Sequence, residues 1–168
     1  MITISPKESY EEIVKNISVG LTPMLASSPG LGKSSIHRQV AKDHRLKLID
    51  FRLSQCTPED LNGFPMREGN KAVFTPFDIF PLKGDPLPLD EEGNQLDGWL
   101  LFFDEISSAS KQVQAAAYKV ILDREVGSFE LHESVAISSA GNLATDKAVT
   151  VAMSTALQSR LIHYEMQS

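Results

Sequence analysis

The amino-acid sequence predicts an α/β fold, with helices on both faces of a mostly parallel β-sheet. Two observations support this prediction. Along the chain, segments typical of strands alternate with segments that have the periodicity of a helix. In addition, residues 99–103 are apolar without interruption, which is typical of a central parallel strand covered on both faces. The length of 168 residues and the hydrophobic content of 42% fit one domain with a sizeable core.

The first predicted element is a helix over residues 10–19, where apolar side chains recur at helical spacing. Ser5 or Ser9 is suited to cap its start, and Gly20 to end it. The next three segments alternate between strand and helix: a short buried strand at 21–27, a helix at 34–43 and a strand with alternating polarity at 46–53.

Residues 56–98 interrupt this alternation, since most of the prolines of the chain lie here together with several glycines. The stretch is too long for an ordinary connection, so we interpret it as a functional insertion. We expect a short hairpin within 71–81 and an acidic, turn-rich loop at 84–98. This hairpin segment contains three phenylalanines, Phe74, Phe77 and Phe80. If exposed, they would form a contact patch. We favour the alternative that they are buried and pack the insertion.

The second half of the chain returns to the alternation of strands and helices. The apolar strand ends in two carboxylates, and an amphipathic helix with one apolar stripe follows it. The expected elements are a strand at 99–105, a helix at 110–125, a strand pair within 128–142 whose second member is buried, a helix toward the end of 146–160, and a last strand at 161–166.

Composition narrows the classes of function. The 22 acidic and 16 basic residues give a net charge of −6, which does not favour nucleic acid as a partner. Cys56 is the only cysteine, so an internal disulfide and a CxxC metal site are excluded, and the histidines lack metal-ligand spacing. No apolar run approaches the ~20 residues that cross a bilayer, and no signal peptide is recognisable, so we expect a cytoplasmic protein without a membrane contact.

The segment "LASSPGLGKSS" at 25–35 places a glycine-containing loop between a strand and a helix, which predicts a phosphate-binding loop. Its backbone N–H groups and the helix N-terminus would surround phosphate oxygens. Lys33 would reach the β- and γ-phosphates and the Ser34 hydroxyl would coordinate Mg²⁺. Ser27 stands where the G-x-x-x-x-G-K-[ST] pattern has glycine. The expected nucleotide-binding residues are Ser28, Pro29, Gly30, Leu31, Gly32, Lys33, Ser34 and Ser35.

Asp104 and Glu105 end the buried strand, and ligands in open α/β sheets bind beyond such ends. We expect Asp104 to bind the nucleotide's Mg²⁺ together with Ser34, directly or through water. Glu105 is suited to polarise the attacking water. The alternative is a pair of loop carboxylates that cap the next helix.

These motifs resemble those of the AAA+ ATPases, and within them the MoxR and dynein-related branch. The resemblance covers nearly the whole chain and implies a P-loop NTPase fold, a three-layer αβα sandwich. Residues 1–168 would form one ATPase core, the large subdomain without its helical lid, and 56–98 would be an insertion before the strand of the acidic pair. The segments that carry the resemblance are "SSPGLGKSS", "CTPEDLNGFP", "LLFFDEISSASKQVQAAAYKVILDREV", "AISSAGN" and "ALQSRL".

The resemblance implies roles for three further residues. Asn142 would be a sensor that orients water and detects the γ-phosphate, where a bare asparagine would otherwise be a turn residue. Arg160 would act as an arginine finger on the ATP of a neighbouring subunit, rather than only interact with a helix dipole. Arg124 lies where such proteins often place an intersubunit basic residue, and the alternative is a solvated ion pair. Lys33, Glu105, Asn142 and Arg160 would then be the catalytic residues.

The function implied is a Mg²⁺-dependent ATPase that assembles into a homo-oligomeric ring, with a hexamer favoured, and remodels a partner protein. The partner is expected to carry a von Willebrand factor A-type domain. Two alternatives stay open: a nucleotide-gated binding module with little turnover, and a DNA-associated loader, which the acidic balance disfavours. A small-molecule kinase is disfavoured by the acidic pair and Asn142.

Overall fold

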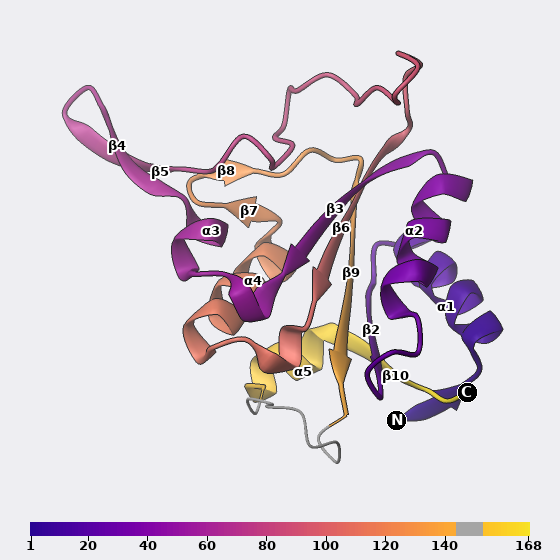
Figure 1. Ribbon diagram of the computed structural model, residues 1–168. Coiled ribbons are helices and arrows are strands. Elements are labelled where there is room, and N and C mark those ends of the chain that lie inside the picture. Colours follow the sequence, from indigo (N-terminus) through magenta and orange to yellow (C-terminus); the bar gives the residue numbers. More distant parts are fainter. Residues whose placement is uncertain (144–152) are drawn as a thin grey trace.

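The computed structural model describes residues 1–143 and 153–168 (Figure 1). Its main sheet has six strands in the order β1-β10-β2-β9-β6-β3, and all neighbouring pairs are parallel. The predicted mostly parallel α/β fold is therefore confirmed. The strands are β1 (Ile2–Ile4), β10 (Leu161–Met166), β2 (Thr22–Ser27), β9 (Val135–Asn142), β6 (Gly98–Asp104) and β3 (Leu46–Arg52).

Helices cover both faces of this sheet, which gives three layers (Figure 1). Helices α1 (Pro6–Ser18) and α2 (Lys33–Asp43) pack together on one face. Helix α4 (Lys111–Asp123) covers the other face, with α3 (Pro58–Asn62) and α5 (Thr155–Arg160) against it. Two short 3₁₀ helices follow β3 and β6, at Leu53–Gln55 and Ile106–Ser108. In the described residues, no helix is long and apolar enough to cross a membrane.

Strand β6 is buried along its whole length, as its continuous apolar run predicted. Its side chains alternate between two cores: Leu100 and Phe102 join the core beneath α1 and α2, whereas Leu101 and Phe103 join the core beneath α4. Each fully buried large side chain contributes about 1.5–3 kcal/mol by leaving water. The strand that ends in the acidic pair is thus held firmly from both faces.

The first helix starts earlier than the apolar periodicity indicated. Ser5 is the N-cap: its hydroxyl accepts from the Glu8 N–H, while the Glu8 carboxylate accepts from the Ser5 N–H. This reciprocal capping box satisfies two backbone donors that helix ends leave unpaired. Strand β1, which precedes the helix, was not expected from the sequence and pairs with β10.

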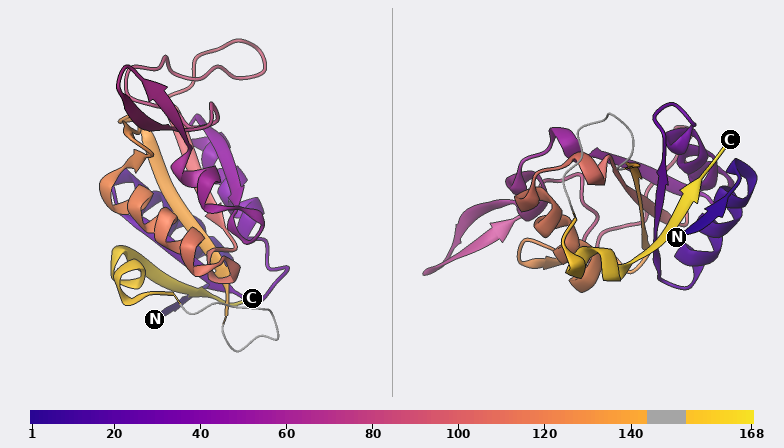
Figure 2. Two further views of the ribbon diagram at one scale, coloured as in Figure 1. Left: turned by 90° about the vertical axis from the view of Figure 1, so that its left-hand side faces the viewer. Right: turned by 90° about the horizontal axis from the view of Figure 1, so that it is seen from below.

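The hairpin of the insertion lies earlier than predicted. Strands β4 (Phe64–Glu68) and β5 (Lys71–Thr75) pair antiparallel around a turn at Gly69 and Asn70, so the expected hairpin within 71–81 is wrong. That segment supplies only β5, because Gly69 takes the positive φ of +61° that a tight turn requires. Figure 2 shows this hairpin projecting away from the sheet.

The two strands expected within 128–142 are present and the second is buried as predicted, but they do not pair with each other. Strand β8 (Phe129–Glu130) pairs with β7 (Glu125–Val126), and β9 instead enters the main sheet between β2 and β6. Both faces of β9 carry small or apolar side chains, which suits a strand between two parallel neighbours. The first part of the helix expected in 146–160 lies outside the described residues, and its end corresponds to α5.

The three phenylalanines of the insertion divide between the two alternatives. Phe80 is 2% exposed and stacks on Phe51, with ring centroids 5.0 Å apart. Phe74 and Phe77 remain 51% and 41% exposed. Neither alternative therefore holds for all three side chains: one packs the insertion and two lie on its surface.

Candidate phosphate-binding site

The candidate site lies at the carboxyl edge of the main sheet. Strands β2, β9, β6 and β3 end there at Ser27, Asn142, Asp104 and Arg52. A pocket of about 360 Å³ opens beside these ends. It brings together most of the predicted site residues and is lined by Pro29, Gly30, Gly32, Lys33, Ser34, Ser35, Arg52, Asp104, Glu105 and Asn142.

The loop from Ser28 to Gly32 depends on two glycines. Gly30 and Gly32 have φ values of +84° and +86°, a region that side chains with a Cβ rarely adopt. No atom lies within 4 Å of where a Cβ would be at either position, so backbone conformation is the constraint rather than space. Gly32 is also the N-cap of α2, and no side chain caps the helix there. The first turn of α2 therefore lines the pocket with no side-chain cap from its N-cap residue, an arrangement that favours anion binding.

Ser27 stands where the loop pattern has glycine, and its hydroxyl forms hydrogen bonds within the loop. Its backbone does not adopt a positive φ, so glycine's freedom is not needed there. The side chain is fully buried, and its Oγ accepts from Lys33 Nζ at 2.9 Å and lies 3.0 Å from the Ser28 carbonyl oxygen, to which it donates. The serine thus helps to position the lysine of the loop.

Lys33 folds back over the loop. Besides Ser27 Oγ, its Nζ lies 3.2 Å from the Ser27 carbonyl oxygen, 3.4 Å from that of Ser28 and 3.3 Å from Asn142 Oδ1. These acceptors are neutral. A phosphate in the pocket would offer charged oxygens, which form hydrogen bonds about twice as strong, so the ammonium can exchange partners when an anion binds.

Ser34 and Asp104 meet within the pocket, where the serine Oγ donates to Asp104 Oδ2 at 3.1 Å. The other carboxylate oxygen accepts from the Glu105 N–H at 2.8 Å, and Asp104 is 6% exposed. A hydroxyl and a carboxylate are oxygen ligands of the kind that Mg²⁺ takes, so these residues fit the ion. Among the described residues no group of three or more His, Cys, Asp or Glu side chains could hold a metal. Magnesium would therefore depend on phosphate oxygens and water for its remaining ligands.

A further carboxyl, Asp50 on β3, lies within electrostatic range of this edge. Burial is the main cause that raises its pKa, and the charge of Asp104 adds to it, whereas Arg52 and Arg38 act in the opposite direction.

Glu105 has a constrained backbone and a restrained side chain. Its φ of +55° is uncommon for a residue with a Cβ and costs on the order of 1 kcal/mol. The Ser54 hydroxyl donates to Glu105 Oε2, and Arg52 Nε lies 3.9 Å from the same oxygen. Arg52 and Ser54 were not among the residues predicted for the site, although Arg52 ends a strand in register with Asp104 and its position could have indicated it.

Asn142 reaches the pocket because β9 lies between the strand of the phosphate loop and the strand of the acidic pair. Its backbone N–H donates to Ser107 Oγ at 3.0 Å. A Cβ at Gly141 would lie 2.7 Å from the same Oγ, so only glycine permits this close packing. Ser107, which the sequence analysis did not single out, thereby ties Asn142 to the segment that follows Glu105.

Arg160 lies far from the pocket. It ends α5, and the next residue, Leu161, pairs with Thr22 at the start of β2, whereas the phosphate loop follows the end of β2. Five residues of strand separate these edges by about 17 Å. Arg160 is exposed and has no hydrogen bond or ion pair within residues 1–143 and 153–168.

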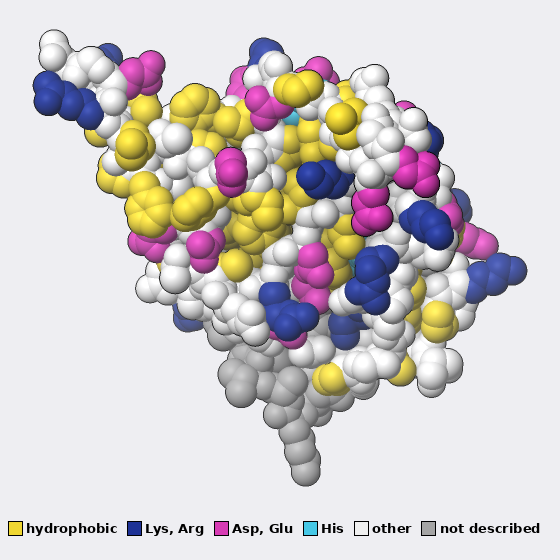
Figure 3. All heavy atoms as spheres, turned by 45° about the horizontal axis from the view of Figure 1, so that its top comes forward, with side chains coloured by type: hydrophobic (Ala, Val, Ile, Leu, Met, Phe, Trp, Pro, Cys, Tyr) yellow, Lys and Arg dark blue, Asp and Glu magenta, His cyan; other side chains and the backbone are white. Residues whose placement is uncertain are grey.

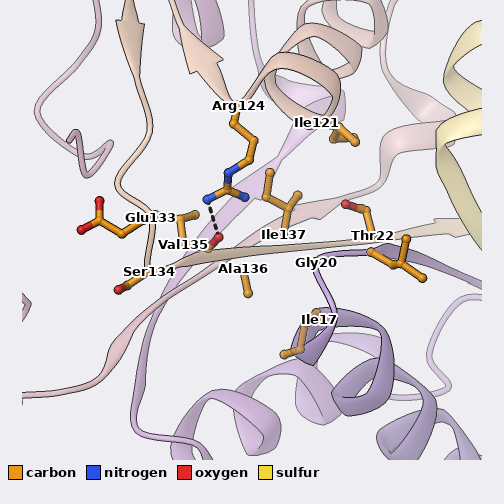
Figure 4. A pocket seen from close by; sticks show the side chains of 11 residues that line it. Ile17, Gly20, Thr22, Ile121, Arg124, Glu133, Ser134, Val135, Ala136 and Ile137 are labelled. Carbon is orange, nitrogen blue, oxygen red and sulfur yellow. Dashed lines mark hydrogen bonds between the residues drawn. The ribbon is translucent and has the colours of Figure 1, made fainter.

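Arg124 also lies away from the pocket, beside a second cavity of about 470 Å³ at the amino edge of the sheet (Figure 4). It ends α4 with a φ of +54° and donates to the carbonyl oxygens of His132 and Val135 at 3.1 and 2.8 Å. Burial lowers the pKa of this guanidinium. The alternative of a solvated ion pair is wrong, since Arg124 has no carboxylate partner among the described residues, and its guanidinium instead binds the backbone of its own chain.

Comparison with known proteins supports the fold. No protein-family profile and no curated protein match the sequence. Among solved structures, the chain matches the crystal structure of a candidate ATPase from Cytophaga hutchinsonii with a TM-score of 0.62 and 17% sequence identity. The match covers 99% of this chain and 47% of that one, so the chain spans about half the length of that protein. At this identity the likeness concerns architecture alone, a mostly parallel six-stranded sheet with helices on both faces.

Proposed function

We propose that the protein binds ATP and hydrolyses it with Mg²⁺, as the AAA+ ATPases of the MoxR and dynein-related branch do. One observation carries the proposal most directly. The uncapped N-terminus of α2, the ammonium of Lys33 and the Ser34–Asp104 pair all adjoin one pocket. A helix N-terminus and a lysine bind phosphates, and a serine next to an aspartate suits the accompanying cation.

Each residue of the pocket then has a distinct task. The amides of residues 28–35 hold the phosphates, and Lys33 neutralises charge on the β- and γ-phosphates. Ser34 and Asp104 hold Mg²⁺, which when bound neutralises the charge that develops on the phosphate oxygens. Glu105 accepts a hydrogen bond from the attacking water and Asn142 orients that water. Positioning and charge stabilisation supply most of the acceleration in such reactions.

Arg160 fits this scheme only as a residue that acts on a neighbouring subunit. The length of β2 separates it from the phosphate loop of its own chain, and its guanidinium is exposed. An arginine supplied from a neighbour neutralises transition-state charge. We therefore propose a homo-oligomeric ring, with a hexamer favoured, in which each site is completed by Arg160 of the next copy.

The partner of the ring is proposed to be a protein. Hydrophobic side chains lie exposed on the insertion, and large exposed apolar patches mark interaction sites. A partner with a von Willebrand factor A-type domain follows from the family resemblance, as does remodelling of that partner.

The second candidate function is a nucleotide-gated binding module with little turnover. The restraint on Glu105 favours it, because Ser54 and Arg52 hold the carboxylate that would otherwise contact water. In this case ATP would change a partner interface without being consumed at an appreciable rate.

The decisive experiment measures ATP turnover against protein concentration, together with particle size with and without Mg·ATP. Interface catalysis predicts a steep rise of specific activity with concentration. Glu105→Gln should retain Mg·ATP and trap the assembly, with turnover reduced about 1000-fold. Tight binding with a flat, near-zero rate would support the switch instead, and absence of Mg·ATP binding by folded protein would refute both. Salt-dependent DNA binding would revive the loader alternative.

A further inference from the structure

His37 is a buried histidine in α2, one helical turn beyond Lys33. Its exposed fraction is zero and it does not line the phosphate pocket. Packing alone would be served by an apolar side chain at such a position, whereas a buried polar ring has to find hydrogen-bond partners. The partners that it finds belong to the elements that build the phosphate site.

Both ring nitrogens of His37 have a partner. Nδ1 lies 2.7 Å from the carbonyl oxygen of Lys33, and Nε2 lies 2.6 Å from Ser138 Oγ. A carbonyl oxygen only accepts, so Nδ1 carries the proton. In the neutral ring Nε2 is then an acceptor, and the Ser138 hydroxyl donates to it. The geometry therefore assigns the tautomer with hydrogen on Nδ1.

The same ring also lies flat on Phe102. The two ring centroids are 3.8 Å apart and the planes differ by 13°. Phe102 and Ser138 are directly paired between β6 and β9. Phe102 precedes Asp104 by two residues, and Ser138 precedes Asn142 by four. One imidazole thus joins the helix that begins with Lys33 to the two strands that end in the other site residues.

We propose that His37 is a positioning residue, which sets the placement of the phosphate-loop helix against the strands of Asp104 and Asn142. It acts through the carbonyl group of Lys33 and the hydroxyl of Ser138, and touches no substrate. The inference rests on the proposed function, because it concerns the geometry of the Mg·ATP site. The inference goes beyond that function, because a residue outside the loop motif would control how the motif is aligned with the strands of Asp104 and Asn142.

The test uses two single variants and their combination. His37→Phe keeps a ring over Phe102 but removes both hydrogen bonds, and Ser138→Ala removes only the link to β9. His44→Phe, at the exposed end of the same helix, is the matched control. Calorimetric titration with Mg·ATP should give a Kd at least tenfold weaker for His37→Phe and unchanged for His44→Phe. The double variant should be no weaker than His37→Phe alone, since both changes break one connection.

Two readouts separate positioning from mere stabilisation. His37→Asn places an amide N–H near the position of Nδ1 and can restore only the bond to the Lys33 carbonyl, so its Kd should lie between those of His37→Phe and the wild type. Nitrogen-15 NMR should show the His37 ring neutral at pH 7 with its proton on Nδ1, and Mg·ATP should shift this signal more than that of His44. If His37→Phe does not fold, Ser138→Ala and the NMR spectra carry the test.

The outcomes distinguish the two proposals. Wild-type protein that is folded but fails to bind Mg·ATP would overturn the proposed function, and the role of His37 with it. Wild-type binding together with unchanged Kd values for His37→Phe and Ser138→Ala would overturn the positioning role alone. A ring that carries its proton on Nε2 would contradict the assigned geometry.

Discussion

The carboxyl edge of the main sheet and the β4–β5 hairpin depart from the usual distribution of side chains in opposite directions. At the sheet edge, polar groups are buried: Ser27 and His37 are fully enclosed, and Asp104 nearly so. On the hairpin, apolar groups are exposed, with Met66 56% and Phe74 51% accessible. Figure 3 shows hydrophobic side chains gathered over the insertion, below a tip that carries charged residues.

The two regions differ in folding free energy, because the buried polar groups of the sheet edge are hydrogen-bonded whereas the exposed apolar groups of the hairpin are not buried. A buried polar group costs stability unless it is paired, and an exposed large apolar group forgoes the stabilisation of burial. Of the eleven large hydrophobic side chains exposed in the described residues, five lie within 64–79. The two regions are thus candidates for two different contacts, an anion at the sheet edge and a protein at the hairpin.

The largest expected effect is a loss of Mg·ATP binding, which should follow from a change at the sheet edge and not from a change on the hairpin. Lys33→Ala should weaken Mg·ATP binding about 1000-fold, because the ammonium is the charged group of the loop. Calorimetric titration measures this effect, and the hairpin variant Phe74→Ser is the control. If Phe74→Ser weakened ATP binding as strongly, the two regions would not be independent.

A second effect concerns acid stability. Burial lowers the pKa of His37 to about 4 from its ordinary value of 6.5. The folded protein thus holds fewer protons than the unfolded chain between these values, so its stability, complete above pH 6.5, falls as the pH drops toward 4. The loss from this group is roughly 3 kcal/mol. Urea unfolding of wild type and His37→Phe across this range should show a steeper loss for the wild type, and parallel curves would contradict the assignment.

A third prediction tests how firmly the hairpin is attached. At Gly127, a Cβ would lie 2.4 Å from the Phe74 carbonyl oxygen and 2.6 Å from that of Asn62, and its φ is +60°. Gly127→Ala should therefore destabilise the protein by about 2 kcal/mol. Urea unfolding gives the magnitude, and hydrogen exchange should show faster opening in the hairpin. Mg·ATP affinity should stay unchanged in the folded variant.

The smallest effect on stability is expected on the hairpin surface. Replacing Met66 and Phe74 by serine should change the free energy of unfolding by less than about 0.5 kcal/mol per site, because neither side chain is buried. Light scattering should show less self-association. A loss above about 1 kcal/mol would mean that these side chains pack within the monomer and are not an exposed surface.

The phosphate loop and the acidic pair could be predicted because their signals are local. The glycines, Lys33 and Ser34 follow one another directly, and Asp104 ends a continuous apolar run. Parallel strands place their carboxyl ends at one edge, so two distant motifs could be expected to meet. The structure brings Ser34 and Asp104 within hydrogen-bond distance across seventy residues of chain.

Other features could not be predicted because they depend on neighbours distant in sequence. The guanidinium of Arg124 binds carbonyl groups of the segment before β9, and Ser54 reaches Glu105 only because β3 lies beside β6. The hairpin is different, because its turn is a local signal: Gly69 and Asn70 form a two-residue turn that the sequence alone can indicate.

The sequence by itself determined three features: the α/β class, the loop that would surround a phosphate, and the strand that would place the acidic pair at the edge of the sheet. These follow from periodicity and from short motifs, which act over a few residues. Only the tertiary structure decided that β9 lies between the strands of those motifs, that His37 links all three elements, and that Arg160 lies at the opposite edge. Strand order and side-chain pairing arise from burial and hydrogen bonding between distant segments, which no local pattern encodes.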